Sequence, residues 1–184
     1  MDPQIRTLVD DSVPSLRVWI DMPAGGTFWF YGVHPRPPAV KDPDKDALQD
    51  SDQRDAELIV VAKEVSRLKD PVIVAGDFND VAWSHTTRLF QRLGGLLDPR
   101  VGRGFYNTYN ADCPFFRYPL DHLFHSDHFK LVRLHRGDHT GSDHFPMLVV
   151  LDQEPQAAQE QEAPPVKEGD REEAERILER PVEE

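Results

Sequence analysis

Alternation of apolar and polar residues predicts a pair of strands near the start of the chain. Residues 16–20 and 28–33 alternate with the period of two that is typical of half-buried strands. Between them lies Pro23-Ala24-Gly25-Gly26, a run of turn-forming residues. We therefore expect an antiparallel hairpin. Its second strand should end at His34, because three prolines between positions 35 and 38 forbid further pairing.

A continuous apolar run at residues 71–75 predicts a strand that is buried on both faces. Gly76 follows this run, and glycine lets the backbone turn sharply and approach a ligand closely. Asp77 and Asn79 come next, at the mouth of the predicted strand. An ordinary turn is the alternative interpretation of these residues, because Asp and Asn favour turns on their own account.

Helical periodicity appears on both sides of this strand. Apolar residues between positions 51 and 68 recur with a period near 3.6, and Ser51 could cap the helix that they predict. A short helix is expected at residues 86–93, closed by two glycines. Residues 98–119 are irregular, which predicts a long loop of the kind that often carries function. Further strands are expected at residues 119–124, 129–134 and 145–151.

The two ends of the chain differ in composition from the rest. Residues 1–12 are mostly polar and predict a flexible lead-in. Residues 152–184 hold 12 acidic and four basic side chains, a net charge of −8. Glu, Gln, Pro and Ala dominate the first half of that segment and cannot bury enough apolar surface to fold, so we expect an acidic, disordered tail. The length of 184 residues then leaves one folded domain, at residues 13–151.

Charge and cysteine content exclude several classes of protein. The total net charge is −12, so the chain outside the tail carries −4 and lacks the broad basic face of a protein that grips long nucleic acid. Cys113 is the single cysteine, which excludes an internal disulfide and a cysteine-based zinc site. No apolar run reaches the roughly 18–20 residues of a membrane span, and the N-terminus lacks the layout of a signal peptide. The chain is therefore expected to be soluble as given, with its cellular location open.

Polar side chains interrupt the apolar strands at or near their ends, where sheet proteins build their sites. Asp121 lies inside an apolar strand, where a carboxylate is costly unless it is paired. Oxygen ligands from Asp and Asn favour Mg²⁺ or Mn²⁺ over zinc. The candidate residues are His34, Asp77, Asn79, Asp121, Asp143 and His144.

Three motifs give these residues a family resemblance. They are Gly76-Asp77-Phe78-Asn79, Pro119-Leu120-Asp121-His122 and Gly141-Ser142-Asp143-His144. With His34 closing a strand upstream, they resemble the endonuclease/exonuclease/phosphatase superfamily, which includes deoxyribonuclease I, exonuclease III, sphingomyelinases and inositol-phosphate phosphatases. The resemblance covers residues 13–151. Residues 32–38 resemble a bacterial branch whose catalytic domain often follows membrane helices, which makes the soluble domain of a longer, membrane-tethered protein one option.

This resemblance implies a divalent-metal-dependent phosphoester hydrolase, that is, a phosphodiesterase, nuclease or phosphatase. Asp77 would orient or deprotonate the attacking water, and Asn79 would donate a hydrogen bond to a non-bridging phosphate oxygen. His144 would bind the phosphate and be held in orientation by Asp121. His34 would contact the phosphate or assist the leaving group.

The resemblance also implies a metal site and a substrate pocket. Asp77 and Asp143 would hold Mg²⁺ or Mn²⁺, and Arg36 would help to bind the substrate. The substrate could be a small molecule, a lipid head group or a nucleic acid, since loops such as residues 98–119 select it.

The implied fold is α+β, a two-layer and mostly antiparallel β-sandwich flanked by helices (αββα), with one departure from the family. The family begins with a strand that ends in Asn and a second strand that carries a Glu, its main metal ligand. Residues 1–33 contain no Glu, so the resemblance implies a fold in which these N-terminal strands are missing. Weak ion binding and slow turnover are therefore expected. The alternative is a non-catalytic remnant of the fold that acts as a binding module.

Further histidines recur at and after the second motif but do not predict a zinc site. His122, His125 and His128 are spaced by three residues, and on a strand and turn this spacing does not converge on one ion. We expect incidental surface histidines there, and likewise at His135 and His139.

Overall fold

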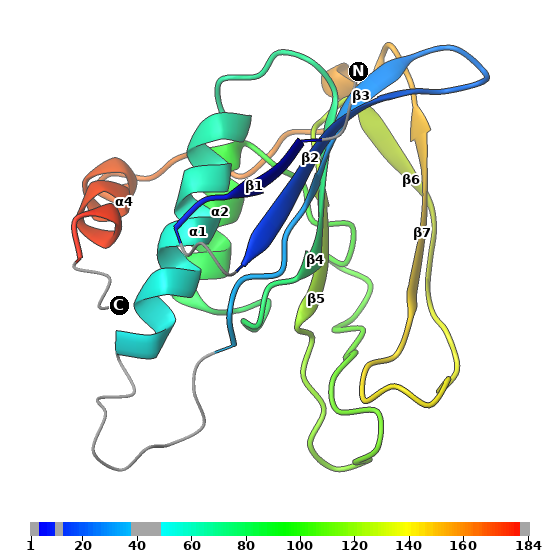
Figure 1. Cartoon of the computed structure of the whole chain (residues 1–184). Coiled ribbons are helices and arrows are strands. Elements are labelled where there is room, and N and C mark those ends of the chain that lie inside the picture. The colour runs from blue at the N-terminus through cyan, green and yellow to red at the C-terminus, as the bar shows by residue number, and fades with distance from the viewer. Residues whose placement is uncertain (1–3, 10–12, 38–48, 181–184) are drawn as a thin grey trace.

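The computed structural model describes residues 4–9, 13–37 and 49–180, which form two sheets with the longer helices on one side (Figure 1). Helices α1 (Gln49–Val65) and α2 (His85–Gly94) cover one face of a five-stranded sheet. A two-stranded sheet lies on the opposite side. Most neighbouring strands are antiparallel, so the expected α+β fold is confirmed.

The larger sheet has the strand order β1-β2-β3-β4-β5. Its pair β3–β4 is parallel, and its other three pairs are antiparallel. The smaller sheet pairs β6 (Phe129–Arg136) with β7 (Met147–Gln153). The strands of the larger sheet are β1 (Gln4–Thr7), β2 (Pro14–Asp21), β3 (Thr27–Gly32), β4 (Val72–Asp77) and β5 (Asp121–His125).

The predicted hairpin and both predicted helices are present. Strands β2 and β3 pair antiparallel around a turn in which the Gly25 amide donates to the carbonyl of Met22 at 3.0 Å. Helix α2 begins after Ser84, whose hydroxyl accepts from the Thr87 amide, and ends before Gly95 in the left-handed conformation. No helix among the described residues has the length and apolar character needed to cross a membrane.

The main core lies between the larger sheet and the two helices α1 and α2. Val72 and Val74 of β4 are buried in it, together with Phe124 of β5. Ile73 and Ala75, which alternate with the two valines, are only half-buried. The prediction that this strand is buried on both faces is therefore wrong for its second face. The reason is a cavity of about 580 Å³ between the two sheets, which Ala75 lines.

The N-terminal segment differs from the flexible lead-in that its composition predicts. Residues Gln4–Thr7 form β1, which pairs with β2 along its whole length. Arg6 Nη1 also donates to Glu64 Oε1 of α1 at 2.8 Å. A strand at the edge of a sheet satisfies its backbone hydrogen bonds by pairing and needs no large apolar face. The composition of the side chains does not reveal this backbone pairing.

The acidic tail also contains ordered structure, in a four-residue helix α3 (Ala157–Glu160) and in α4 (Asp170–Leu178). Helix α4 buries Ala174 and Ile177 against α1 and α2, at the outer left of Figure 1. Arg92 of α2 donates two hydrogen bonds of 2.7 Å to Asp170. A disordered tail is therefore wrong for this helix, because a bidentate ion pair orients it and two apolar side chains then suffice to dock it.

Truncation of Ile177 tests whether α4 belongs to the folded unit. Ile177 is 3% exposed, and Ile→Ala in a core costs about 2–5 kcal/mol. We expect the low end of that range, because neighbours at the edge of the core can relax. Ile177→Ala should then lower the thermal midpoint by about 4–8 °C. Glu179→Ala, an exposed change at the end of the same helix, should leave the midpoint unchanged. Equal midpoints for both variants would contradict the packing of α4.

Candidate active site

Three strands of the larger sheet bring polar residues to one edge. Strands β3 and β4 are parallel, so their carboxyl ends lie at the same edge. Strand β5 runs antiparallel to β4, and its first residue, Asp121, pairs with the last residue of β4, Asp77. His34 follows β3 at this edge. The register of the sheet therefore gathers side chains that are far apart in the sequence.

Gly76 allows the ends of β3 and β4 to approach closely. Its φ angle is +152°, and a Cβ at this position would lie 1.8 Å from the carbonyl oxygen of Val33. The neighbouring Val33 amide donates to the carbonyl of Ala75 at 3.0 Å. Any side chain at position 76 would force these two backbones apart, so glycine is required here for a steric reason.

His144 reaches the same edge on the segment that precedes β7. Residues 98–119 form the long loop that the sequence predicts, and this loop holds the segment in place. The Ala111 amide donates to the carbonyl of Asp143 at 2.7 Å, and the Phe145 amide donates to that of Thr108 at 2.9 Å. The ring of Tyr109 lies 5.0 Å from that of His144, centroid to centroid. The loop therefore positions His144, a role that sequence reasoning did not give it.

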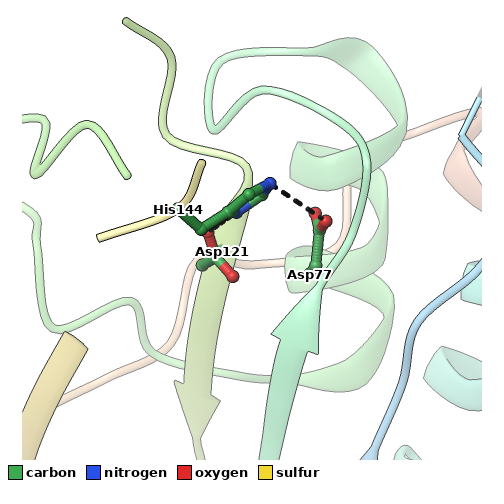
Figure 2. Close-up of side chains that lie close together, drawn as sticks. All are labelled: Asp77, Asp121 and His144. Carbon is green, nitrogen blue, oxygen red and sulfur yellow. Dashed lines mark hydrogen bonds and ion pairs between the residues drawn. The ribbon is translucent and has the colours of Figure 1, made fainter. Parts of the chain in front are cut away.

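The side chains of Asp77, Asp121 and His144 point toward one another (Figure 2). His144 Nδ1 lies 2.7 Å from Asp121 Oδ2, a hydrogen bond that orients the imidazole. His144 Nε2 and His34 Nε2 each lie 3.8 Å from Asp77 Oδ2. The structure thus brings together four of the six candidate residues around one carboxylate.

Asn79 lies beside this cluster in a left-handed turn. Its φ angle is +49°, which is uncommon for a residue with a side chain. Its backbone amide donates to Asp77 Oδ1 at 2.8 Å, and its side-chain Nδ2 donates to the carbonyl of Pro35 at 2.9 Å. A side-chain amide carries two hydrogens. The second hydrogen of Asn79 can therefore be donated to a ligand.

The local electrostatics favour a protonated histidine beside a basic carboxylate. Burial raises the pKa of Asp77, and the Asp121 charge adds to this effect, while the Asn79 amide and the two histidines oppose it. Burial alone would lower the pKa of His144, but the hydrogen bond and charge of Asp121, with the charges of Asp77 and Asp143, raise it above its ordinary value.

Two candidates lie at the margin of the cluster. Among the described residues, the carboxylate and imidazole atoms that could share one cation belong to Asp77, Asp121 and His144, and they lie within 4.8 Å of one another. Asp143 is exposed and lies outside this group, and Arg36 is exposed on the segment after β3. A ligand role for Asp143 and substrate binding by Arg36 stay predictions.

The expectation of surface histidines on β5 is wrong. His122 and His125 are 4% and 3% exposed, because His122 packs against Phe78 and Phe124 and His125 against Phe129. Burial and the neighbouring Arg100 guanidinium lower the pKa of His122 to about 3, so this imidazole is neutral.

Sequence reasoning also assigned no role to Arg54 and Asp80, two charged residues that are buried beside Asn79. A charged residue inside an apolar helical stripe is the signal that could have identified Arg54.

The cluster opens onto the cavity between the two sheets. Asp121, His122 and His144 line this cavity, together with Arg100. Its other walls are mainly apolar and come from β5, β6 and β7, for example at Leu123. A ligand of small-molecule size could therefore place a polar group at Asp121 and His144.

Comparison with known proteins identifies the motifs. The sequence profile of the endonuclease/exonuclease/phosphatase family matches residues 2–144. The chain belongs to this family. The match includes the first motif, the second motif and the Asp143-His144 pair, and therefore the whole cluster. No curated protein matches the sequence.

Solved structures of endonuclease/exonuclease/phosphatase proteins share the fold. A family protein from Beutenbergia cavernae is 21% identical over 77% of this chain and 39% of its own, with a TM-score of 0.58. The human Nocturnin catalytic domain, with bound sulfate, is 14% identical over 84% of this chain and 59% of its own, with a TM-score of 0.61. A mannosyl-6-phosphatase from Bacteroides thetaiotaomicron is 24% identical over 76% of this chain and 57% of its own, with a TM-score of 0.52. The chain thus spans less than two thirds of the length of each.

The pKa of His144 provides a direct test of the cluster in metal-free buffer. Because the folded pKa is raised, the imidazolium should stabilise the fold below the ordinary histidine pKa, and this contribution should be lost as the pH rises through the raised value. Asp121→Asn removes the negative charge that contributes most to raising the pKa of His144, so this pKa should fall. Asp127→Asn, beside His128 instead, should leave it unchanged. Proton NMR of the His144 imidazole across pH measures this pKa in the unmodified chain and in both variants. An unchanged pKa in Asp121→Asn would contradict the pairing of His144 with Asp121.

Proposed function

We propose that this chain is a divalent-metal-dependent phosphoester hydrolase of the phosphodiesterase, nuclease or phosphatase type. The observation that carries the proposal is the convergence of Asp77, Asp121 and His144 at one edge of the sheet, with Asn79 beside them. Family membership supports the reaction class. The sulfate in the Nocturnin catalytic domain is a tetrahedral anion with the shape of phosphate, which agrees with an anion-binding role for the fold.

Asp77 is the proposed acceptor of the proton from the attacking water. Its raised pKa makes it a stronger base than an ordinary aspartate, and its half-buried position limits competition from solvent. His34 and His144 both face the same carboxylate oxygen, Oδ2. Their positive charge, when protonated, would keep Asp77 ionised and ready to accept the proton.

His144 and Asn79 are the proposed ligands of the phosphoryl oxygens. Asp121 accepts from His144 Nδ1, so a protonated ring presents its Nε2–H toward Asp77 and the space beside it. Asn79 adds an uncharged donor, and His34 a third donor that can reach the phosphate or the leaving oxygen. Fixed donors of this kind stabilise charge that develops in an in-line displacement.

The carboxylates at this edge suit a hard divalent cation. Mg²⁺ binds proteins through one or two carboxylates and keeps several waters, and Asp77 and Asp121 lie close enough to offer two. Asp77 and Asp143 are the proposed ligands for Mg²⁺ or Mn²⁺, and the position of Asp121 adds a third carboxylate to choose from. A bound cation would neutralise phosphate charge and lower the pKa of a coordinated water.

A binding module without catalysis is the second candidate function. One observation favours it: among the described residues, the group that could share one cation offers only three ligand atoms. Such a module would retain anion binding through His144 and Asn79 while turnover is lost.

Hydrolysis assays separate the two functions. The purified chain should cleave bis(p-nitrophenyl) phosphate or p-nitrophenyl phosphate slowly with Mg²⁺ or Mn²⁺, because few carboxylates hold the ion. Chelation should abolish the reaction, and Asp77→Ala should reduce turnover by about 10²–10³. Asp127→Ala changes a partly exposed aspartate beside His128, outside the cluster, and should retain full turnover.

Turnover of the chain that equals that of Asp77→Ala would overturn the hydrolase proposal. Calorimetric titration with inorganic phosphate then tests the binding module, which requires an affinity that falls in His144→Ala.

A further inference from the structure

Two buried side chains bind backbone carbonyl groups of the turn that carries Asp77 and Asn79. Arg54 Nη1, from α1, donates to the carbonyl of Asn79 at 2.9 Å. His122 Nε2, from β5, lies 2.9 Å from the carbonyl of Asp80. A carbonyl can only accept, so Nε2 carries the hydrogen of this neutral ring. The helix α1 and the strand β5 therefore bind successive carbonyl groups of the turn.

Arg54 is fixed before it reaches the turn. Its side chain is 11% exposed, and its Nε and Nη2 donate to Asp55 Oδ1 at 3.0 and 2.8 Å. The remaining Nη1 is left to bond the Asn79 carbonyl, and it also lies 3.9 Å from Asp80 Oδ1. A guanidinium has planar and rigid geometry, so fixing two of its nitrogens fixes the direction of the third.

His122 is fixed in a similar way. Arg100 Nη2 donates to His122 Nδ1 at 2.7 Å, and Arg100 itself is paired with Asp98 at 2.8 Å. The imidazole packs on the ring of Phe78, with 4.8 Å between centroids. Because Nδ1 accepts from Arg100, the only ring hydrogen lies on Nε2 and is directed at the turn.

The turn has an uncommon conformation. Asn79 has a left-handed backbone, which few residues with a Cβ adopt and which asparagine tolerates best. The Asp80 side chain ties the next residue to α2, where it accepts from the hydroxyls of Ser84 and Thr87. Asn79 makes three bonds here, through its carbonyl to Arg54, its backbone amide to Asp77 Oδ1 and its side-chain amide to Pro35. A change in the φ or ψ angle of Asn79 would disturb at least one of them. Orientation of both site residues therefore depends on the two carbonyl bonds.

We propose that Arg54 and His122 are positioning residues, which hold the Asn79 turn in the conformation that aims Asn79 and Asp77 at the substrate. This proposal rests on the proposed phosphoester hydrolysis for its effect on rate. The positioning itself can be measured without any reaction.

Kinetic variants test the effect on rate. Arg54→Met and His122→Leu remove the donors and should lower kcat by about 10–100-fold, since small misplacements at a reacting centre have effects of this size. KM should change by less than about threefold, because the polar atoms of both side chains are already bonded to protein groups. His122→Gln keeps an amide donor near the position of Nε2 and should recover most of the lost kcat.

Arg92→Met is the matched control. Arg92 is also 11% exposed and bidentate with an aspartate, but it joins α2 to α4. It should lower the thermal midpoint without changing kcat. If Arg92→Met lowers kcat as much as Arg54→Met does, the two arginines act through general stability and the positioning role is overturned.

Amide exchange measured by NMR tests the positioning independently of hydrolysis. In Arg54→Met and His122→Leu, the Asn79 backbone amide should exchange about tenfold faster or more, because its bond to Asp77 is loosened. Its side-chain resonances should also shift, and Arg92→Met should change neither. Absence of turnover in the unmodified chain would defeat the proposed hydrolysis and leave this readout intact. Unchanged exchange and shifts in both variants would overturn the positioning role.

Discussion

The contact between Gly76 and the backbone of Val33 is the steric constraint on which the site depends. A Cβ at position 76 would overlap the Val33 carbonyl, so the ends of β3 and β4 can lie this close only with glycine there. Because these two strands are parallel, the backbone leaves the sheet at the same edge after each of them. His34 and Asp77 are the residues that emerge there, and their 3.8 Å separation follows from the backbone contact.

The remaining site residues are added to this edge by pairing and by loop contacts, and the result is electrostatically costly. Asp121 arrives through the antiparallel register of β5, which sets two carboxylates side by side. Burial is the main cause of the raised pKa of Asp77, and the Asp121 charge adds to it. Burial lowers the pKa of His144, but the hydrogen bond and charge of Asp121 outweigh that effect and raise it. A cluster of like charges is stabilised when a cation or a protonated imidazole joins it. The same charges that weaken the free protein therefore favour the binding of a metal ion.

Sequence reasoning predicted the elements and the candidate residues better than it predicted their surroundings. Apolar runs and glycines indicated β4, α2 and the ends of strands, because these patterns reflect local backbone geometry. The convergence of His34, Asp77, Asp121 and His144 was predicted from strand ends, whereas the parallel pairing and the register that produce it are long-range properties. The ends of the chain were mispredicted for a related reason. Composition counts apolar residues, but β1 is held by backbone pairing and α4 by an ion pair to Arg92.

Sequence reasoning also failed to identify the buried polar residues. These residues lie on one side of the sheet, and a cavity lies on the other. Arg and His are residue types that are usually found at the surface, so the sequence did not indicate that Arg54 and His122 are buried. Arg54 lies 25 positions from its partner Asn79, and His122 lies 42 positions from its partner Asp80. On the helix side of the sheet, these bonds and the tightly packed core hold the site turn rigid. On the other side, half-buried strand residues border a cavity that reaches Asp121 and His144. The bonds on one side support the geometry of the proposed donors, and the cavity on the other side leaves room for the proposed phosphoester ligand.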